Sequence, residues 1–473
     1  MRILIVAPRY RPYGQFYELP LGLAYISSYL KSKGKDVTFL NLNEYPDDKK
    51  FFEMVGTADV LCTGGLSVHY RQLQDIISNA RKVNPKVRII LGGGIYSSDP
   101  ELMLGALDID VGIPGEGEAR LNAVLDNVPA QPIDNLDDLP FPDYEGLGVR
   151  NYLDRQLCGD EHYTYTLDKP RCLPIISSRS CPHNCSFCFH PLGKVYRQRS
   201  LGNFFKEVEY LIETYQVNML AVLDELISAD KERLAAFCDR ISKYQINWMA
   251  QIRADSVDRD TLKRMKAAGC HQVSIGVESG SNKVLESMNK HTTIERIGQT
   301  LEWAYELGLG IQGNFIFGDK AETVATAQET LDWWMAHRQY MLNLTYIIPY
   351  PGCDLYKGAV KSGLIPDKID YLDKGCPTIA LTPKIGAISR LVEDHKPLGV
   401  LYAKVISSKI TGGDRYRGVL YNTQILCPHC EKEVEYTNLY DGSTNANMVR
   451  GVYRIGCRNC NQRFDVKKGE LFI

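Results

Sequence analysis

The chain has 473 residues, 24% of them charged, and a formal net charge of −2 at pH 7. This length allows about three domains with cores of ordinary size. The near-neutral charge provides no basic surface for nucleic acid or an anionic membrane, and no apolar run is long enough to span a bilayer. The first eight residues are too short for a signal-peptide core. We therefore expect a cytoplasmic protein without nucleic-acid or membrane partners.

The first 130 residues alternate short apolar segments with amphipathic ones. Strands are predicted over 3–7, 36–41, 60–62 and 87–91, and helices over 21–33 and 73–83. Such alternation predicts an α/β domain with a doubly wound parallel sheet, whose ligands bind at the carboxyl ends of the strands. Glycines follow several of these strands, at 64–65, 92–94 and 112–117. Glycine after a strand is also ordinary turn chemistry, so this signal is weak alone.

A second strand–helix alternation occupies residues 169–365 and predicts a partial (β/α) barrel. Its strands are expected over 217–223, 248–252, 272–277 and 310–317. Charged or amide residues lie at or near their ends, namely Glu225, Arg253, Glu278 and Asn314. Such groups at the ends of inward-facing strands are costly unless a polar ligand meets them. The irregular, proline-rich segment before the barrel predicts an extended linker over 131–168.

Three cysteines in one loop, Cys181, Cys185 and Cys188, form a CxxxCxxC motif after a predicted buried strand. Iron–sulfur clusters are held by thiolates, and three thiolates leave one iron of a four-iron cluster open for another ligand. The motif therefore predicts a catalytic 4Fe-4S cluster. A zinc ion held with His183 or His190, or cysteines that are merely close in sequence, are the alternatives. Most of the other cysteines, such as Cys62, are expected to be small core residues.

The residues around this loop resemble the radical S-adenosylmethionine (SAM) family, most closely in segments 273–279 and 282–290. The resemblance implies that SAM binds the open iron and is cleaved to a 5′-deoxyadenosyl radical. It also implies a set of SAM contacts: Phe187, Glu225, Arg253, Glu278, Ser279 and Asn314. The chain departs from the family pattern in the turn 317–323, and Cys353 stands where threonine is usual. We assign no role to Cys353.

The N-terminal domain resembles the cobalamin-binding domain that precedes many radical SAM cores, over segments 19–30, 66–68, 91–94 and 114–118. The resemblance implies a set of cobalamin contacts: Ser67, Gly92, Gly93, Gly94 and Glu116. No DxHxxG motif is present, so a histidine ligand to cobalt is not expected. A domain that keeps this fold without cobalamin is the alternative.

A second metal motif lies near the C-terminus, where Cys427, Cys430, Cys457 and Cys460 form two CxxC pairs. Strand-like residues separate the pairs, which is zinc-ribbon spacing. An auxiliary iron–sulfur cluster on the same thiolates is the alternative. We expect His429 to be exposed and not a ligand. Residues 366–420 are expected to form a cap or connector, with helical stretches in 385–405 and a loop at 411–414, and residues 421–473 the zinc-ribbon-like module.

Together these signals predict a cobalamin-dependent radical SAM enzyme that methylates an unactivated carbon or phosphorus of a small-molecule or carrier-bound substrate. Such an enzyme needs an electron donor, for example flavodoxin or ferredoxin. A radical SAM rearrangement, cyclisation or oxidation is the first alternative. A transfer-RNA methylthiotransferase would be expected to carry a second cysteine triad near its N-terminus, where only Cys62 occurs. A non-enzymatic, metal-stabilised interaction protein is the last alternative, and the intact cysteine triad and Glu278 argue against it.

Overall fold

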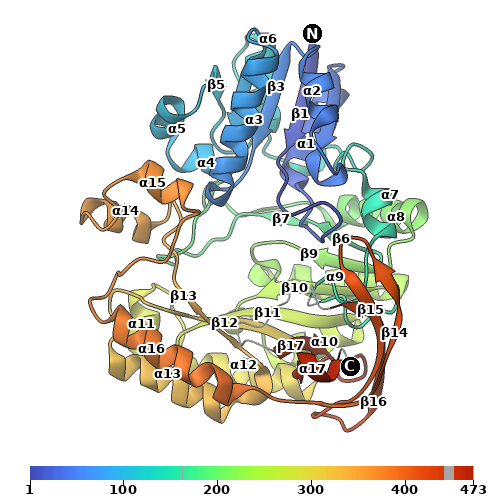
Figure 1. Ribbon diagram of the computed structural model, residues 1–473, viewed down its shortest axis with the longest axis vertical. Helices are drawn as coiled ribbons and strands as arrows, with labels where there is room; N and C mark the ends of the chain where they lie inside the picture. Colours follow the sequence, from blue (N-terminus) through green and yellow to red (C-terminus); the bar gives the residue numbers. More distant parts are fainter. Residues whose placement is uncertain (162, 441–451, 472–473) are drawn as a thin grey trace. The chain divides into compact units, whose positions relative to one another are not determined.

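The computed structural model describes residues 1–161, 163–440 and 452–471 (Figure 1). The chain divides into two compact units. The first comprises Met1–Asp154, Phe187–Glu207 and Ile348–Ile379, and the second comprises Arg155–Ser186, Val208–Ile347 and Ala380–Ile473.

A five-stranded parallel sheet forms the centre of the first unit, in the order β2-β1-β3-β4-β5. Its strands are β1 (Arg2–Ala7), β2 (Asp36–Asn41), β3 (Val60–Gly64), β4 (Arg88–Gly92) and β5 (Val111–Gly112). The central strands are nearly continuous apolar runs because helices cover both faces of the sheet. The helices are α1 (Leu21–Ser32), α2 (Lys49–Val55), α3 (Tyr70–Val83), α4 (Gly93–Ser98), α5 (Pro100–Ala106) and α6 (Glu118–Asp126).

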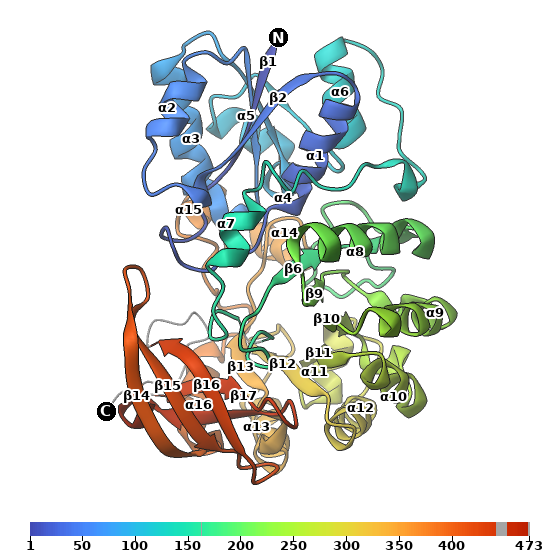
Figure 2. The same cartoon turned by 90° about the vertical axis from the view of Figure 1, so that its right-hand side faces the viewer.

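This arrangement confirms the predicted doubly wound sheet. In Figure 2, α1 and α6 lie on one side of the sheet, and α2 and α3 lie on the other. The strand order reverses between β1 and β3, and the carboxyl ends of strands at such a point are where open α/β sheets bind ligands. The first unit also contains α7 (Val149–Asp154), β8 (Arg197–Gln198), α14 (Asp354–Lys361) and α15 (Lys368–Asp373).

The second unit is built on a six-stranded parallel sheet in the order β13-β12-β11-β10-β9-β6, which confirms the predicted partial barrel. Its strands are β6 (Cys172–Ile175), β9 (Met219–Val222), β10 (Asn247–Ile252), β11 (Cys270–Glu278), β12 (Gly310–Phe317) and β13 (Asn343–Tyr346). The short strand β7 (Ser178–Arg179) follows β6. The helices are α8 (Leu201–Tyr215), which begins in the first unit, α9 (Lys231–Ile241), α10 (Arg259–Ala267), α11 (Asn282–Ser287), α12 (Ile294–Glu306) and α13 (Val324–Ala336).

The two faces of this sheet differ in chemistry because residues alternate along each strand. On β12 the buried Phe315 packs against Trp333 of α13, with ring centroids 5.9 Å apart. Gln312 and Asn314 of the same strand lie on the opposite face and are only partly buried. The helices therefore cover one face, and the other, the inner face of the partial barrel, carries polar side chains.

The C-terminal part of the second unit is mainly antiparallel. Its elements are α16 (Ile385–His395), β14 (Lys404–Asp414), β15 (Gly418–Leu426), β16 (Glu433–Tyr440), β17 (Val452–Gly456), β18 (Arg463–Lys467) and α17 (Lys468–Leu471). The loop expected at 411–414 is instead the end of β14, where Gly412 and Gly413 pair with β15. Among the residues described, no helix has both the length and the apolar character needed to cross a membrane.

Candidate active site and metal sites

The chain turns sharply just before the cysteine loop, and a buried carboxylate holds this turn. Asp224, at the carboxyl end of β9, accepts hydrogen bonds from the backbone N–H of Ser177 at 2.6 Å and of Ser178 at 3.0 Å. The Ser177 hydroxyl donates a third bond at 2.5 Å. Burial raises the pKa of Asp224, although these bonds oppose the rise. Asp224 directly follows the strand expected over 217–223, and its hydrogen bonds fix the entry to the cysteine loop.

The loop itself is tied to the turn that follows α11. The Ser186 N–H donates to the Met288 carbonyl at 2.9 Å, and Asn289 Nδ2 donates to the Asn184 carbonyl at 2.7 Å. Ser180, directly before the first cysteine, has a left-handed backbone with φ of 69°, which is costly for a residue other than glycine. This strained turn and the two bonds give the loop a defined course.

The three cysteines of the motif are free thiols with different exposure. Cys181 and Cys185 are partly buried and Cys188 is exposed. Burial raises the pKa of Cys181. The hydroxyls of Ser178, Ser180 and Ser186 are buried and have no hydrogen-bond partner among the described residues. Buried hydroxyls are normally satisfied, so unpaired donors gathered around two thiols fit a loop that surrounds an acceptor-rich group such as an iron–sulfur cluster.

Arg253, at the end of β10, connects the loop to the rest of the barrel rim. Its Nη1 lies 3.7 Å from the Cys185 Sγ, and its Nη2 donates to the Lys290 carbonyl at 2.6 Å. Asp255 accepts from Nε at 3.0 Å and from Nη2 at 2.9 Å, a bidentate pair that holds the pKa of Asp255 below its usual range. Arg253 is therefore placed to neutralise negative charge at the cysteines.

The predicted SAM contact Glu278 lies beside this network. Its carboxylate accepts from Lys290 Nζ at 2.7 Å, and the two side chains are 11% and 8% exposed. The register of β11 against β12 shifts between Gly276 and Glu278, which turns Glu278 out of the regular ladder. No role was predicted for Lys290, although it ends the segment 282–290 on which the family resemblance rests.

The other predicted SAM contacts occupy different environments. Asn314 lies on the inner face, where its Oδ1 accepts from Asn343 Nδ2 at 2.8 Å. Glu225 is exposed and Phe187 is partly buried. Ser279 is buried, and its hydroxyl accepts from the Ser281 N–H at 3.1 Å and lies 3.2 Å from the Thr330 hydroxyl. These bonds fix the Ser279 side chain in the turn after β11.

Two rows of inner-face residues cross the sheet. One row aligns Gln251, Ser274 and Gln312 on β10, β11 and β12, and the Ser274 hydroxyl donates to Gln312 at 2.5 Å. The next row toward the carboxyl ends aligns Gly276, Asn314 and Asn343. Both rows are neutral, so they suit a ligand recognised by hydrogen bonds. Gln251, Gln312 and Asn343 were not predicted; inward-facing amides on adjacent strands were the available signal.

In the first unit, the glycines after β3 and β4 fit against one another. A Cβ on Gly93 would lie 2.7 Å from the Gly65 carbonyl oxygen, and a Cβ on Gly64 would lie 2.8 Å from that of Gly92. Gly93 also has a φ of 82°, which favours glycine. A Cβ on Gly94 would lie 3.1 Å from the Leu66 side chain. Ser67, another predicted cobalamin contact, is buried in the turn after β3. Close packing between the loops after β3 and β4 therefore explains part of this glycine pattern.

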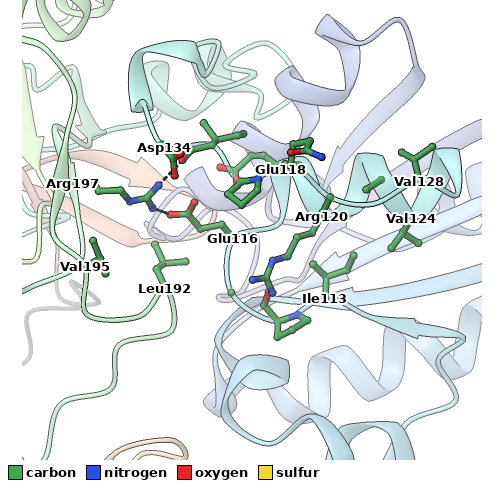
Figure 3. A pocket seen from close by; sticks show the side chains of 18 of the residues that line it. Ile113, Glu116, Glu118, Arg120, Val124, Val128, Asp134, Leu192, Val195 and Arg197 are labelled. Atoms are coloured by element: carbon green, nitrogen blue, oxygen red, sulfur yellow. Dashed lines mark hydrogen bonds and ion pairs between the residues drawn. The ribbon is translucent and has the colours of Figure 1, made fainter.

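A cavity of about 710 Å³ follows β5 in the first unit (Figure 3). Its wall includes apolar residues such as Ile113 and Val124 and the charged residues Glu116 and Arg197, which form an ion pair. Arg197 also donates to the Ile133 carbonyl at 2.7 Å. Cofactor sites commonly have this size and this mixture of apolar walls with few polar groups. The residues thus fit part of a large cofactor, at the end of the sheet where the predicted contact Glu116 was expected.

The four C-terminal cysteines form a compact tetrad. Their sulfur atoms all lie within 4.8 Å of one another, with Cys427–Cys460 and Cys430–Cys457 Sγ separations of 3.8 Å. Four thiolates around one zinc ion at about 2.3 Å lie about 3.8 Å apart. Hydrogen bonds from neighbouring thiols lower the pKa of Cys457. The tetrad therefore fits a single tetrahedral metal ion.

His429 corrects one expectation. It is partly buried, with Nδ1 3.0 Å from the Tyr305 hydroxyl and Nε2 2.7 Å from the Arg463 carbonyl. Burial lowers the pKa of its imidazole. Both ring nitrogens are engaged, so His429 is not a metal ligand, as predicted, but it docks the first knuckle on α12 and is not simply exposed.

Comparison with known proteins agrees with this geometry. Residues 15–125 match the B12 binding domain, and residues 175–333 match the Radical SAM superfamily. An uncharacterised methyltransferase of Pyrococcus horikoshii is 27% identical over 382 residues, covering 73% of this chain and 79% of the relative. The anaerobic magnesium-protoporphyrin IX monomethyl ester cyclase of Rubrivivax gelatinosus is 26% identical over 419 residues, covering 79% and 71%.

A solved structure shares the fold. It is the radical SAM methyltransferase TsrM from Kitasatospora setae with tryptophan substrate and a SAM analogue bound; the TM-score is 0.61 at 17% identity, and the match covers 76% of each chain. The matched radical SAM and B12-binding domains imply a 4Fe-4S cluster, SAM and cobalamin as cofactors. The chain therefore carries a radical SAM domain over residues 175–333, preceded by a B12-binding domain over residues 15–125.

Proposed function

We propose that this protein is a cobalamin-dependent radical SAM methyltransferase acting on an unactivated carbon or phosphorus of a small-molecule or carrier-bound substrate. The single observation that carries the proposal is the presence, in one chain, of a B12-binding domain and a cysteine loop held at the carboxyl ends of a parallel barrel sheet. A methyl-carrying cofactor and a radical generator are the two reagents that such a reaction needs.

When bound, the cluster supplies the electron that cleaves SAM to a hydrogen-abstracting radical, and cobalamin supplies the methyl group. In the proposal, Cys181, Cys185 and Cys188 hold the cluster. Arg253, 3.7 Å from Cys185, offsets its negative charge. Glu278, positioned by its ion pair with Lys290, accepts hydrogen bonds from the SAM ammonium or ribose.

The remaining predicted contacts complete the two binding sites. Asn314 donates to the adenosine from the inner face of the barrel, and Glu225, Ser279 and Phe187 border SAM. Ser67, Gly92, Gly93, Gly94 and Glu116 border cobalamin. Zinc is proposed for the tetrad of Cys427, Cys430, Cys457 and Cys460, because the 3.8 Å sulfur separations match one tetrahedral ion.

The domain boundaries inferred from sequence remain part of the proposal, namely 1–130 for cobalamin binding, 131–168 for the linker, 169–365 for the barrel, 366–420 for the connector and 421–473 for the zinc module. The proposed electron donor is a flavodoxin or ferredoxin, and the proposed location is the cytoplasm. A cyclisation is the second candidate, since a curated relative that matches 79% of the chain is named a cyclase.

The experiment is anaerobic reconstitution with iron, sulfide, cobalamin and zinc. We expect about four iron atoms, one cobalt and one zinc per chain, and 5′-deoxyadenosine formation under reduction. Cys185→Ala should abolish the iron signal and the nucleoside, whereas Cys376→Ala, at a buried cysteine outside the motifs, should change neither.

Each result has a separate meaning. Iron-dependent nucleoside formation without cobalt binding would refute the methyltransferase and leave a radical SAM enzyme of another kind. Transfer of label from methyl-labelled SAM to a substrate, tested on candidates from neighbouring genes, separates methylation from cyclisation. Nucleoside formation by Cys185→Ala would refute the cluster assignment.

A further inference from the structure

The tetracysteine module is docked on the barrel at the amino-terminal ends of two strands. The second knuckle contacts the start of β12, where Asn461 Nδ2 donates to the Gly308 carbonyl at 2.9 Å and Gln462 Nε2 donates to the Leu309 carbonyl at 2.8 Å. A Cβ on Gly310 would lie 2.7 Å from the Asn461 carbonyl oxygen, so the two backbones are in close contact. The module therefore forms a floor beneath this part of the barrel (Figure 1, β17 beside β12).

Arg454, on β17 between the two CxxC pairs, reaches from this floor into the sheet. Its Nε and Nη2 donate to the buried Asp465 at 2.9 and 3.2 Å. Its Nη1 donates to the Met341 carbonyl at 3.2 Å and to Asn343 Oδ1 at 2.7 Å. Asp465 is fully buried and fixes the guanidinium, so that Nη1 is aimed at the first residue of β13.

This contact sets the direction of a hydrogen-bond relay. A guanidinium has donors only, so Asn343 must accept from it through Oδ1 and turn its NH₂ group away. That NH₂ group donates to Asn314 Oδ1 at 2.8 Å. Asn314 must then present its own NH₂ group outward. The direction follows from Arg454 itself and does not depend on how either amide is assigned.

The inner-face row has a defined neighbour on each side of Asn314. On β11 a Cβ on Gly276 would lie 2.3 Å from Glu278 Oε1, so the Glu278–Lys290 ion pair occupies this side, while Asn343 occupies the other side. No described residue has a recorded hydrogen bond to the Asn314 amide nitrogen, and the side chain is partly exposed. The row thus ends in two N–H donors that face the ligand side of the sheet.

We propose that Arg454 of the tetracysteine module is a positioning residue that holds Asn314 as a hydrogen-bond donor toward acceptors of the SAM adenosine, through Asn343. This inference rests on the proposed function, because it requires SAM on the inner face of the barrel. The metal module is then part of the SAM site: it determines which end of the Asn314 amide the ligand meets.

The decisive variant is Asn343→Asp, which keeps the size of the side chain. A carboxylate still accepts from Arg454 but cannot donate, so Asn314 must reverse its amide and present an oxygen to the adenosine. We expect the Kd for SAM to rise about tenfold, measured by equilibrium dialysis on anaerobically reconstituted protein without reductant. The kcat for 5′-deoxyadenosine at saturating SAM should change less than the KM.

Four further variants separate an effect on the hydrogen-bond relay from an effect on the fold. In an Asn314→Ala background, Asn343→Asp should have no additional effect on the Kd, since the reversed group is gone. Asn422→Asp adds the same charge on β15, away from the barrel sheet, where Asn422 Oδ1 accepts from the Asn438 N–H at 3.2 Å, and should leave the Kd unchanged. Arg454→Gln removes the imposed direction and should weaken SAM binding, and Arg454→Lys, which retains obligatory donors, should restore most of it.

The outcomes are distinguishable. An unchanged Kd in Asn343→Asp, with Asn314→Ala weakened, would overturn the relay and leave the proposed function intact. An unchanged Kd in Asn314→Ala would remove Asn314 from the SAM site and overturn the inference. Wild-type protein that retains its cluster but binds no SAM would instead refute the proposed function.

Discussion

Glu278 pairs with Lys290, at 2.7 Å between Oε1 and Nζ, although the Glu278 backbone is left-handed with φ of 65°. Such a conformation costs a residue with a side chain about 1–3 kcal/mol. The ion pair and the register shift beside it hold the carboxylate at the rim of the barrel sheet. The strained backbone of Glu278 thus fits a ligand site in which the position of the Glu278 carboxylate is fixed.

Gly276→Ala should displace this ion pair without unfolding the barrel. A Cβ at this position would lie 2.3 Å from Glu278 Oε1 and 2.6 Å from Lys290 Nζ. Both atoms are ends of flexible side chains, so they can move aside, but the pair must open. We expect the KM for SAM in 5′-deoxyadenosine formation to rise about tenfold, a cost typical of one lost charge-assisted bond.

Gly386→Ala is the matched control, because a Cβ there meets no atom within 4 Å. Equal KM values for Gly276→Ala and wild type would show that the Glu278–Lys290 geometry is not needed for SAM binding.

Ser186→Ala should lower the reduction potential of the cluster. The Ser186 hydroxyl is buried beside Cys185 and has no partner among the described residues. Hydrogen bonds to cluster sulfurs favour the more negative, reduced state, so removing a donor makes reduction harder. Redox titration followed by electron paramagnetic resonance (EPR) measures the change, with Ser242→Ala, at an exposed serine, as the control. A potential equal to that of wild type would place the hydroxyl outside the cluster environment.

Glu322 should make the stability of the protein depend on pH. Burial raises the pKa of this carboxyl from 4.5 to about 7. The folded state therefore holds a proton that the unfolded chain releases, and stability decreases as the pH rises toward 7. Between pH 6 and pH 8 this group alone should cost about 1 kcal/mol of unfolding free energy.

Glu322→Gln should remove that cost, since an amide oxygen can still accept from the Gly318 N–H. Thermal unfolding at pH 6 and pH 8 should show a smaller loss of Tm for the variant than for wild type. Titrating thiol–metal sites contribute equally to both proteins and cancel. Exposed Glu329→Gln on α13 is the control, and an identical pH response of Glu322→Gln and wild type would contradict the assignment.

His69 should not coordinate cobalt. It follows β3 at the point where the strand order reverses, and its ring lies 4.5 Å from that of Tyr10, which follows β1. His69 Nδ1 accepts from the Leu66 N–H at 3.2 Å, so the ring proton of the neutral imidazole is on Nε2. Burial lowers the pKa of His69, which keeps the ring neutral.

The measurement is the EPR spectrum of the cob(II)alamin-loaded protein. We expect no splitting from a protein nitrogen, and the same spectrum from His69→Ala. Nitrogen splitting that disappears in His69→Ala would show that the His69 ring reorients and binds cobalt.

The candidate metal-binding cysteines were predicted from their local spacing in the sequence. The CxxxCxxC and paired CxxC motifs place thiolates on single tight turns, where geometry depends on few residues, and strand-helix alternation predicted both parallel sheets. The end of β14 was missed because consecutive glycines at Gly412 and Gly413 are typical of a loop, whereas pairing with β15 stabilises them as a strand.

Tertiary structure alone decided which distant groups meet. Asp224 and Ser177 are 47 positions apart, and Arg454 and Asn343 are 111 apart. These pairs depend on strand register and on the docking of the C-terminal module, which no local pattern specifies. The sequence by itself predicted a three-thiolate cluster loop and a separate tetracysteine site, because both depend on the local spacing of cysteines. Only the tertiary structure decided that the tetracysteine module contacts the amino-terminal ends of β12 and β13, because packing brings Arg454 against β13.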